Sequence, residues 1–173
     1  MPQASLFCIM KGNKFIFLII ALIMPVTVFV FLKLFGRNEF RVPVRYEAGN
    51  IAAPPNCDYA YTAPYRVADS VFTTLGLNDN DSLYVFYFDP SIASGMNRIF
   101  VEFKGDLVQM ISSESVAATI DPNHLRECIL LTKADSSVVL VDHLHRVRGY
   151  YVGNDRDEID RLAVEMKIIL KQY

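Results

Sequence analysis

The chain has 173 residues, of which 52% are hydrophobic, 17 are Lys or Arg and 19 are Asp or Glu. This length allows one ordinary domain together with a membrane segment. It is too short for two ordinary domains and a membrane segment. From residue 37 onward, 14 basic and 19 acidic residues give a net charge of −5 without a basic stripe. The charge pattern therefore excludes a typical nucleic-acid-binding surface.

Residues 15–35 are predicted to form a transmembrane helix. The 18 residues from Phe15 to Leu32 carry no charge, and only Thr27 among them is polar. If Lys33 extends its ammonium group to the membrane surface, the apolar run reaches the end of this range. A helix of 21 residues is about 31 Å long, which matches one hydrocarbon core. Pro25 removes one backbone donor near the middle and predicts a mild kink.

A cleaved signal peptide is the main alternative for this segment. Its apolar region is usually about 7–15 residues long and is followed by small residues at a cleavage site. Here Lys33-Leu34-Phe35 follows instead, which favours a retained anchor. A buried core helix would need a larger core than this chain is expected to build. Residues 1–14 form an N-terminal flank, in which Met10 is an alternative start.

Residues 36–64 are predicted to be a tether because they contain several prolines, namely Pro43, Pro54, Pro55 and Pro64. Within this range Phe40, Val42 and Val44 alternate, as in a short strand or an interfacial segment. Three tyrosines, Tyr59, Tyr61 and Tyr65, cluster at its end. They either cover the sheet or form a surface for a partner, and the sequence leaves both alternatives open.

Residues 65–173 are predicted to form one globular domain. Apolar spacing predicts a short helix over 67–75, a buried strand over 82–88, a helix over 92–103 and a strand over 107–111. A short helix is expected from Asp121, and strands over 128–132, 138–142 and 147–152. The last two strands are expected to pair as a hairpin across His143–Arg146. Asn154 or Asp155 is expected to cap a terminal helix, and Glu158, three residues after Asp155, gives a capping-box-like pattern. This α-β-α-β-α-β-β-β-α order suggests an α/β fold, a thioredoxin-like sandwich.

The last fifth of the chain carries a resemblance to a known family. It contains Val138–Asp142, then Arg146–Tyr151, then Asp155–Leu170. This succession resembles the C-terminal end of the Sco branch (Sco/SenC) of thioredoxin-like copper chaperones. The Phe35–Asn38 segment is similar to the juxtamembrane segment of that branch. The resemblance implies a single-pass protein of the inner (plasma) membrane, a periplasmic domain, and respiratory or copper-enzyme assembly proteins as partners.

The copper ligands of that family do not carry over to this chain. The family uses two cysteines just after the first buried strand and a histidine before the leucine-valine-aspartate strand. The corresponding positions here are Ser91, Gly95 and Ala134. Copper(I) prefers soft thiolate ligands, which these residues lack. The sequence thus predicts no catalytic residue, no metal ligand and no cofactor, and a non-enzymatic interaction or assembly factor.

Cys57 and Cys128 are the only cysteines after the span, since Cys8 precedes it. If the domain lies outside the cytoplasm, one structural disulfide is expected between them, and it would stabilise by about 4 kcal/mol. The alternative is two unpaired thiols. An alternative function is accordingly a redox or metal-binding protein that uses Cys57, Cys128 or the histidines. A purely structural envelope protein is a third hypothesis.

Other polar residues have two interpretations each. His143 and His145 either bind a metal with Asp142 or His124, or are solvated turn residues, which is favoured. Arg146, Arg148 and Tyr150 share one strand face, where solvated edge charges are favoured over an anion site. A nucleophilic role for Ser91 lacks a histidine base and a nucleophile-elbow motif.

The direction of the span is the least determined feature. Basic residues follow the span at Lys33, Arg37, Arg41 and Arg45, whereas only Lys11 and Lys14 precede it. This count by itself predicts a cytoplasmic domain. The family resemblance predicts the opposite side, and large domains translocate despite flanking charge, so the periplasmic placement is preferred.

Overall fold

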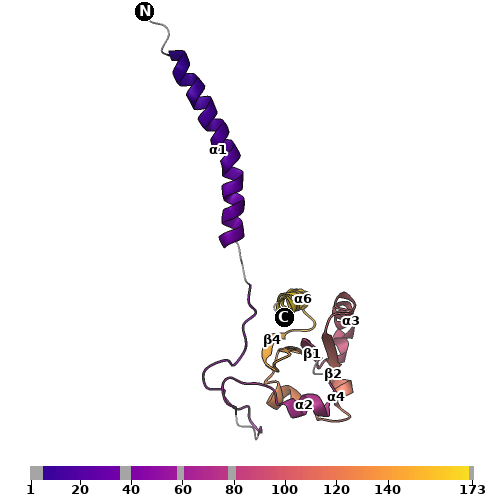
Figure 1. Ribbon diagram of the computed structural model, residues 1–173. Coiled ribbons are helices and arrows are strands. Elements are labelled where there is room, and N and C mark those ends of the chain that lie inside the picture. Colours follow the sequence, from indigo (N-terminus) through magenta and orange to yellow (C-terminus); the bar gives the residue numbers. More distant parts are fainter. Residues whose placement is uncertain (1–5, 36–39, 58–60, 78–80, 172–173) are drawn as a thin grey trace, which may run out of the picture. The chain divides into compact units, whose positions relative to one another are not determined.

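A computed structural model of the chain describes residues 6–35, 40–57, 61–77 and 81–171 (Figure 1). It contains two compact units, Met1–Phe40 and Arg41–Tyr173. The first unit is the helix α1, Leu6–Phe35, which begins before the predicted residue 15. Its Ile16–Leu34 portion is long and apolar enough to cross a membrane, a test that signal sequences also pass. The Thr27 hydroxyl donates to the Ile23 carbonyl at 2.9 Å, so this polar group is satisfied within the helix.

The second unit is built on a four-stranded mixed sheet. Its strands are β1 (Leu83–Tyr87), β2 (Val108–Ser112), β3 (Val138–Asp142) and β4 (Val147–Tyr151). They lie in the order β2-β1-β3-β4. β1 and β2 are parallel, whereas β3 is antiparallel to both β1 and β4. The chain is therefore a mixed α/β protein with an apolar N-terminal helix, as predicted at that level.

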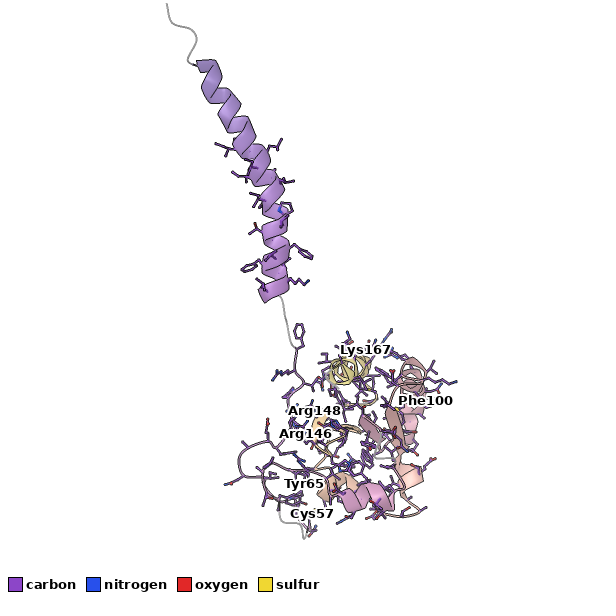
Figure 2. The ribbon with its side chains drawn as sticks, viewed as in Figure 1. Cys57, Tyr65, Phe100, Arg146, Arg148 and Lys167 are labelled. Carbon is purple, nitrogen blue, oxygen red and sulfur yellow. A yellow bond between two sulfur atoms is a disulfide. The ribbon has the colours of Figure 1, made fainter. Side chains whose placement is uncertain are left out.

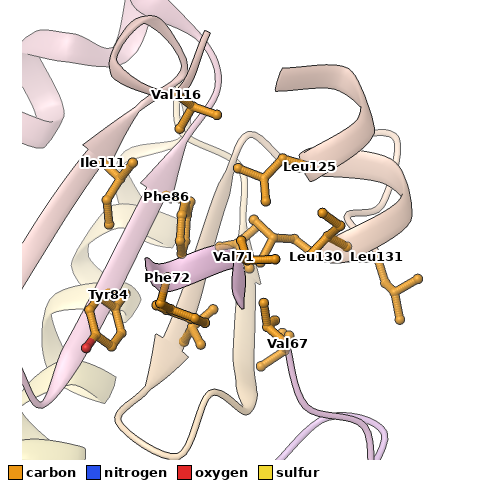
Figure 3. Packing of buried hydrophobic residues seen from close by; sticks show 14 of the residues in the cluster. Val67, Val71, Phe72, Tyr84, Phe86, Ile111, Val116, Leu125, Leu130 and Leu131 are labelled. Carbon is orange, nitrogen blue, oxygen red and sulfur yellow. The ribbon is translucent and has the colours of Figure 1, made fainter. Parts of the chain in front are cut away.

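Both faces of the sheet are covered, which explains the uninterrupted apolar sequence of β1. Tyr84 and Phe86 face a core that includes α2 (Asp69–Thr74), as Figure 3 shows. Leu83 and Val85 face the opposite core, which contains α3 (Ala93–Glu102) and α6 (Arg156–Leu170). All four side chains are fully buried, and each contributes about 1.5–3 kcal/mol by its removal from water.

Short polar residues begin most of the remaining helices. Asp89 caps the 3₁₀ helix η1 (Pro90–Ile92), Ser112 caps α4 (Ser113–Val116), Asp121 caps α5 (Pro122–His124) and Asp155 caps α6. In each case a side-chain oxygen accepts a hydrogen bond from a backbone N–H of the first turn. Of the two expected cap residues, Asn154 and Asp155, the structure shows Asp155 as the cap. Tyr173 lies outside the described residues.

The predicted strand over 128–132 is wrong. The chain continues from α5 into a π-helical turn, η2 (Leu125–Ile129), and Leu131 then adopts a left-handed conformation with φ of 52°. Cys128, Ile129, Leu130 and Leu131 are all buried. A short apolar run is compatible with a buried strand or a buried helical turn, and periodicity does not distinguish them.

The predicted tether belongs largely to the globular unit from Arg41 onward. Val42 is buried against the core that contains α6, and the Arg45 N–H donates to the Val147 carbonyl at 2.8 Å. Residues 40–44 lie in no strand, so of the two alternatives for Phe40, Val42 and Val44 the short strand is wrong. Prolines prevent a helix here but do not prevent side-chain packing. Residues 36–39 of the predicted tether lie outside the described residues.

Candidate functional site

A pocket of about 350 Å³ lies where β1 and β4 end and β3 begins. The antiparallel direction of β3 brings the loop before it to the same end of the sheet as the residues after β1. The pocket is lined by Phe88, Asp89, Pro90, Arg126, Ala134, Asp135, Ser136, Ser137, Val152 and Asn154. The fold thus brings Ala134 together with Asp89 and Pro90, the residues immediately before Ser91.

Asp89 supplies an ionised carboxylate on one side of this pocket. Its Oδ1 accepts a hydrogen bond from the Ser91 backbone N–H at 2.8 Å. Hydrogen bonds from the Ser91 side chain and backbone lower the pKa of Asp89, so the carboxylate is charged at neutral pH. No histidine lines the pocket among the described residues, so Ser91 has no base there to activate it.

Arg126 holds the opposite side of the pocket in place. Its Nη2 donates to the carbonyl of Ala134 at 3.3 Å and to that of Ser136 at 3.2 Å. The Ser137 hydroxyl accepts from the Gly153 N–H at 2.9 Å, which ties the start of β3 to the end of β4. These bonds order a polar rim with two carboxylates, Asp89 and Asp135, and one guanidinium.

The residues at this end of the sheet do not fit copper(I). Ser91 and Gly95 offer no thiolate, and Ala134 offers no imidazole. An added Cβ at Gly95 would meet nothing within 4 Å, so no close packing demands glycine there. Across the described ranges, no cluster of three or more His, Cys, Asp or Glu side chains is arranged to hold a metal.

Cys57 and Cys128 are joined by a disulfide away from this pocket lining. Their Cα atoms are 5.4 Å apart, and 71 positions separate them in sequence. The bond ties the proline-containing segment to η2, and Cys57 can be followed in Figure 2. Neither sulfur is available as a thiolate while this bond is present.

Tyrosine hydroxyls bind the backbone around the end of η2, which the sequence did not predict. Each of four consecutive carbonyls accepts from a different tyrosine. Tyr61 donates to Cys128 at 2.7 Å, Tyr65 to Ile129 at 2.6 Å, Tyr150 to Leu130 at 2.8 Å and Tyr46 to Leu131 at 3.5 Å. A helix end leaves such carbonyls without partners in the helix itself. Tyr61 and Tyr65 therefore cover buried backbone, and Tyr59 lies outside the described residues.

Tyr150 remains protonated at neutral pH. Burial raises the pKa of Tyr150, and its hydrogen bond with the Tyr46 hydroxyl raises it further. A protonated phenol is required for these bonds, because only the O–H can donate to a carbonyl. The cluster and the disulfide together fasten the 41–65 segment to η2.

Replacing Tyr65 by phenylalanine is expected to lower the free energy of unfolding by about 1–2 kcal/mol. Tyr65 is buried, and its loss of the hydroxyl would leave the Ile129 carbonyl without this donor. Urea denaturation followed by near-ultraviolet circular dichroism reports the change. Tyr87→Phe is the matched control, since it removes a hydroxyl from a half-buried residue of β1 and should change stability by less than about 0.5 kcal/mol. Equal losses in the two variants would contradict the assignment.

The histidines and arginines at the β3–β4 hairpin are not simply solvated turn residues. His145 Nδ1 lies 2.7 Å from Asp69 Oδ1, and its ring stacks on Phe72 with a centroid distance of 3.8 Å. Asp142, the proposed metal partner of His143 and His145, is instead buried with arginines. Arg146 Nε donates to Asp142 Oδ2 at 2.9 Å.

Arg148 corrects the expectation of solvated edge charges. Its side chain is only 5% exposed, and its Nε lies 3.4 Å from Asp142 Oδ2 without hydrogen-bond alignment. Figure 2 labels Arg146 and Arg148 on this part of the sheet. The carboxylate of Asp142 is fully buried and compensates both guanidinium charges in part. The sequence signal for the ion pairs of Asp142 with Arg146 and Arg148 is an acidic residue at the end of an apolar strand. The burial of Asp142, however, depends on the fold.

Comparisons with known proteins found no matching family profile, no matching curated protein and no matching solved structure.

Proposed function

We propose that this chain is a single-pass inner-membrane protein whose periplasmic, thioredoxin-like domain is a non-catalytic interaction or assembly factor for a respiratory or copper enzyme. One observation carries the proposal. The end of the sheet that holds the copper ligands in the resembled Sco family retains a pocket here, but Ser91, Gly95 and Ala134 supply none of those ligands. A pocket of this kind is suited to binding a partner rather than to metal or thiol chemistry.

The sheet topology supports the thioredoxin-like assignment. The order β2-β1-β3-β4, with only β3 reversed, is the arrangement expected for a thioredoxin-like sandwich. Helices α3 and α6 cover one face, and α2 with η2 covers the other. Fold alone does not identify function, so the partner class rests on the resemblance of the C-terminal segment.

The disulfide supports a periplasmic domain. Disulfides persist in oxidising compartments and are rare in the cytosol. The Cys57–Cys128 bond therefore favours the side that the family resemblance implies over the side that Lys33, Arg41 and Arg45 imply. An apolar α1 supplies the anchor for either direction.

The contacts of the described residues support a structural role for the cysteines, His145 and Asp142 rather than the alternative of a redox or metal-binding protein. Cys57 and Cys128 are bonded to each other, and His145 contacts Asp69 and Phe72. Asp142 is engaged by Arg146 and Arg148. These residues are therefore assigned to the support of the fold.

Purification of the tagged full chain from solubilised membranes tests the proposal. We expect oxidase subunits or copper-assembly proteins to co-purify with it. Asn154→Trp should reduce this recovery several-fold, because Asn154 lines the pocket and an indole would occupy it. The matched control is Asn123→Trp, an exposed asparagine outside the pocket lining, which should retain the partners.

The result that opposes the proposal is a partner list without respiratory or copper-assembly proteins. Recovery that is equal in Asn154→Trp and the wild type would reject the pocket as the binding site and leave another surface responsible. An unrelated single-span protein with the same tag controls for non-specific recovery.

A further inference from the structure

We propose that the free edge of strand β2 pairs with β2 of a second copy of this chain. β2 is the first strand in the order β2-β1-β3-β4, so only one of its sides is paired. The Leu83 N–H donates to the Leu107 carbonyl, and hydrogen-bond directions alternate along a strand. The N–H and C=O of Met110 consequently point away from β1, and neither has a backbone partner within the described part of the chain.

The sequence of β2 lacks the features that block edge pairing. Its residues, Val-Gln-Met-Ile-Ser, include no charge and no proline. Natural sheet edges are commonly protected by lysine, proline or a covering segment. Large apolar side chains are also exposed in the residues that lead into β2: Phe100 and Val101 in the last turn of α3, and Leu107 just before β2, are 50%, 63% and 54% exposed.

The opposite edge of the same sheet is protected. The Arg45 N–H donates to the Val147 carbonyl of β4 at 2.8 Å, and Arg161 Nη2 donates to the Tyr150 carbonyl at 2.9 Å. Val42 is buried beside this segment. The chain thus covers the backbone of the edge strand β4 with its own residues and leaves the edge strand β2, which has no charged residue, open.

A second copy is the occupant that the membrane anchor favours. This step rests on the membrane span of the proposed function. Copies anchored in one membrane are confined to the same surface, and this confinement raises the effective concentration of each domain for the other. Antiparallel pairing about a two-fold axis uses the same strand as donor and acceptor, and no like charges within β2 face each other.

Cross-linking of two differently tagged full-length copies in intact membranes tests the pairing. Formaldehyde is added before solubilisation, and recovery of one tag with the other is measured. We expect Leu107→Glu to reduce this recovery about tenfold. In the paired dimer the substitution places two symmetry-related negative charges at the shared edge, where they repel each other. Val164→Glu is the matched control: Val164 on α6 is 55% exposed, close to the 54% of Leu107, and recovery should be unchanged.

Met110→Pro is the second variant, because it removes an outward N–H without removing a bond to β1. It should also reduce recovery about tenfold, and circular dichroism checks its folding; if it unfolds, Leu107→Glu decides. The pairing is overturned if wild-type copies are not recovered together, if Leu107→Glu and Val164→Glu behave alike, or if β2 cross-links only to a different protein.

Carbonate extraction of the same membranes separates the proposed pairing from the proposed membrane anchor. Release of the chain rejects the anchor, whereas retention without cross-linking rejects only the pairing.

Discussion

Replacing Asp142 by alanine is expected to lower the free energy of unfolding by about 3–5 kcal/mol. The carboxylate is fully buried and accepts hydrogen bonds from the backbone N–H groups of Leu144 and Arg146, both at 3.0 Å. It also pairs with the side chains of Arg146 and Arg148. Without it, Arg148 would remain buried with an uncompensated charge, which is the costly case for a broken ion pair.

Urea denaturation of the detergent-solubilised chain measures this loss. The chain has no tryptophan and nine tyrosines, so the near-ultraviolet circular dichroism of the tyrosines is the suitable signal. Asp160→Ala is the control, because it breaks the exposed ion pair with Arg98 and should cost less than about 1 kcal/mol. A loss for Asp142→Ala no larger than that of the control would show that the buried cluster is not a source of stability.

Removing the disulfide by Cys57→Ser is expected to lower the free energy of unfolding by about 4 kcal/mol. The bond closes a loop across 71 positions, and its loss restores conformational entropy to the unfolded chain. The tyrosine hydroxyls would continue to hold the 41–65 segment against η2, so we expect a less stable domain rather than a rearranged one.

Cys8→Ser is the control for this experiment, since Cys8 precedes the span and should leave the stability of the domain unchanged. Thiol titration of the denatured, unreduced wild-type chain should detect one free thiol of the three cysteines. Three titrating thiols, or equal stability with and without reductant, would refute the bond.

Several features follow from residues that are close in sequence. The apolar and aromatic run of β1 predicted burial on both faces, and Tyr84 and Val85 indeed face opposite cores. The β3–β4 hairpin and the cap of α6 at Asp155 were also predicted, because turn length and capping act over a few residues. The absence of cysteine at Ser91 and Gly95 is likewise a property of the sequence alone.

Other features depend on contacts between distant segments. Residues 128–132 have the composition of a strand, yet tyrosine hydroxyls from Tyr46, Tyr61 and Tyr65 satisfy carbonyls that a strand ladder would otherwise need to satisfy. The donors and acceptors of these bonds are 64 to 85 positions apart in sequence, so local pattern carries no information about them.

The membrane-helix candidate and the lack of cysteine at positions 91 and 95 were determined by the sequence itself, because each depends only on which residues are present. The tertiary structure decided that the 41–65 segment packs on the domain, that Arg148 is buried with Asp142, and that Ala134 meets Asp89 at one pocket. Burial and pocket formation require the antiparallel return of β3, which aligns residues that are about 50 positions apart and that no local periodicity relates.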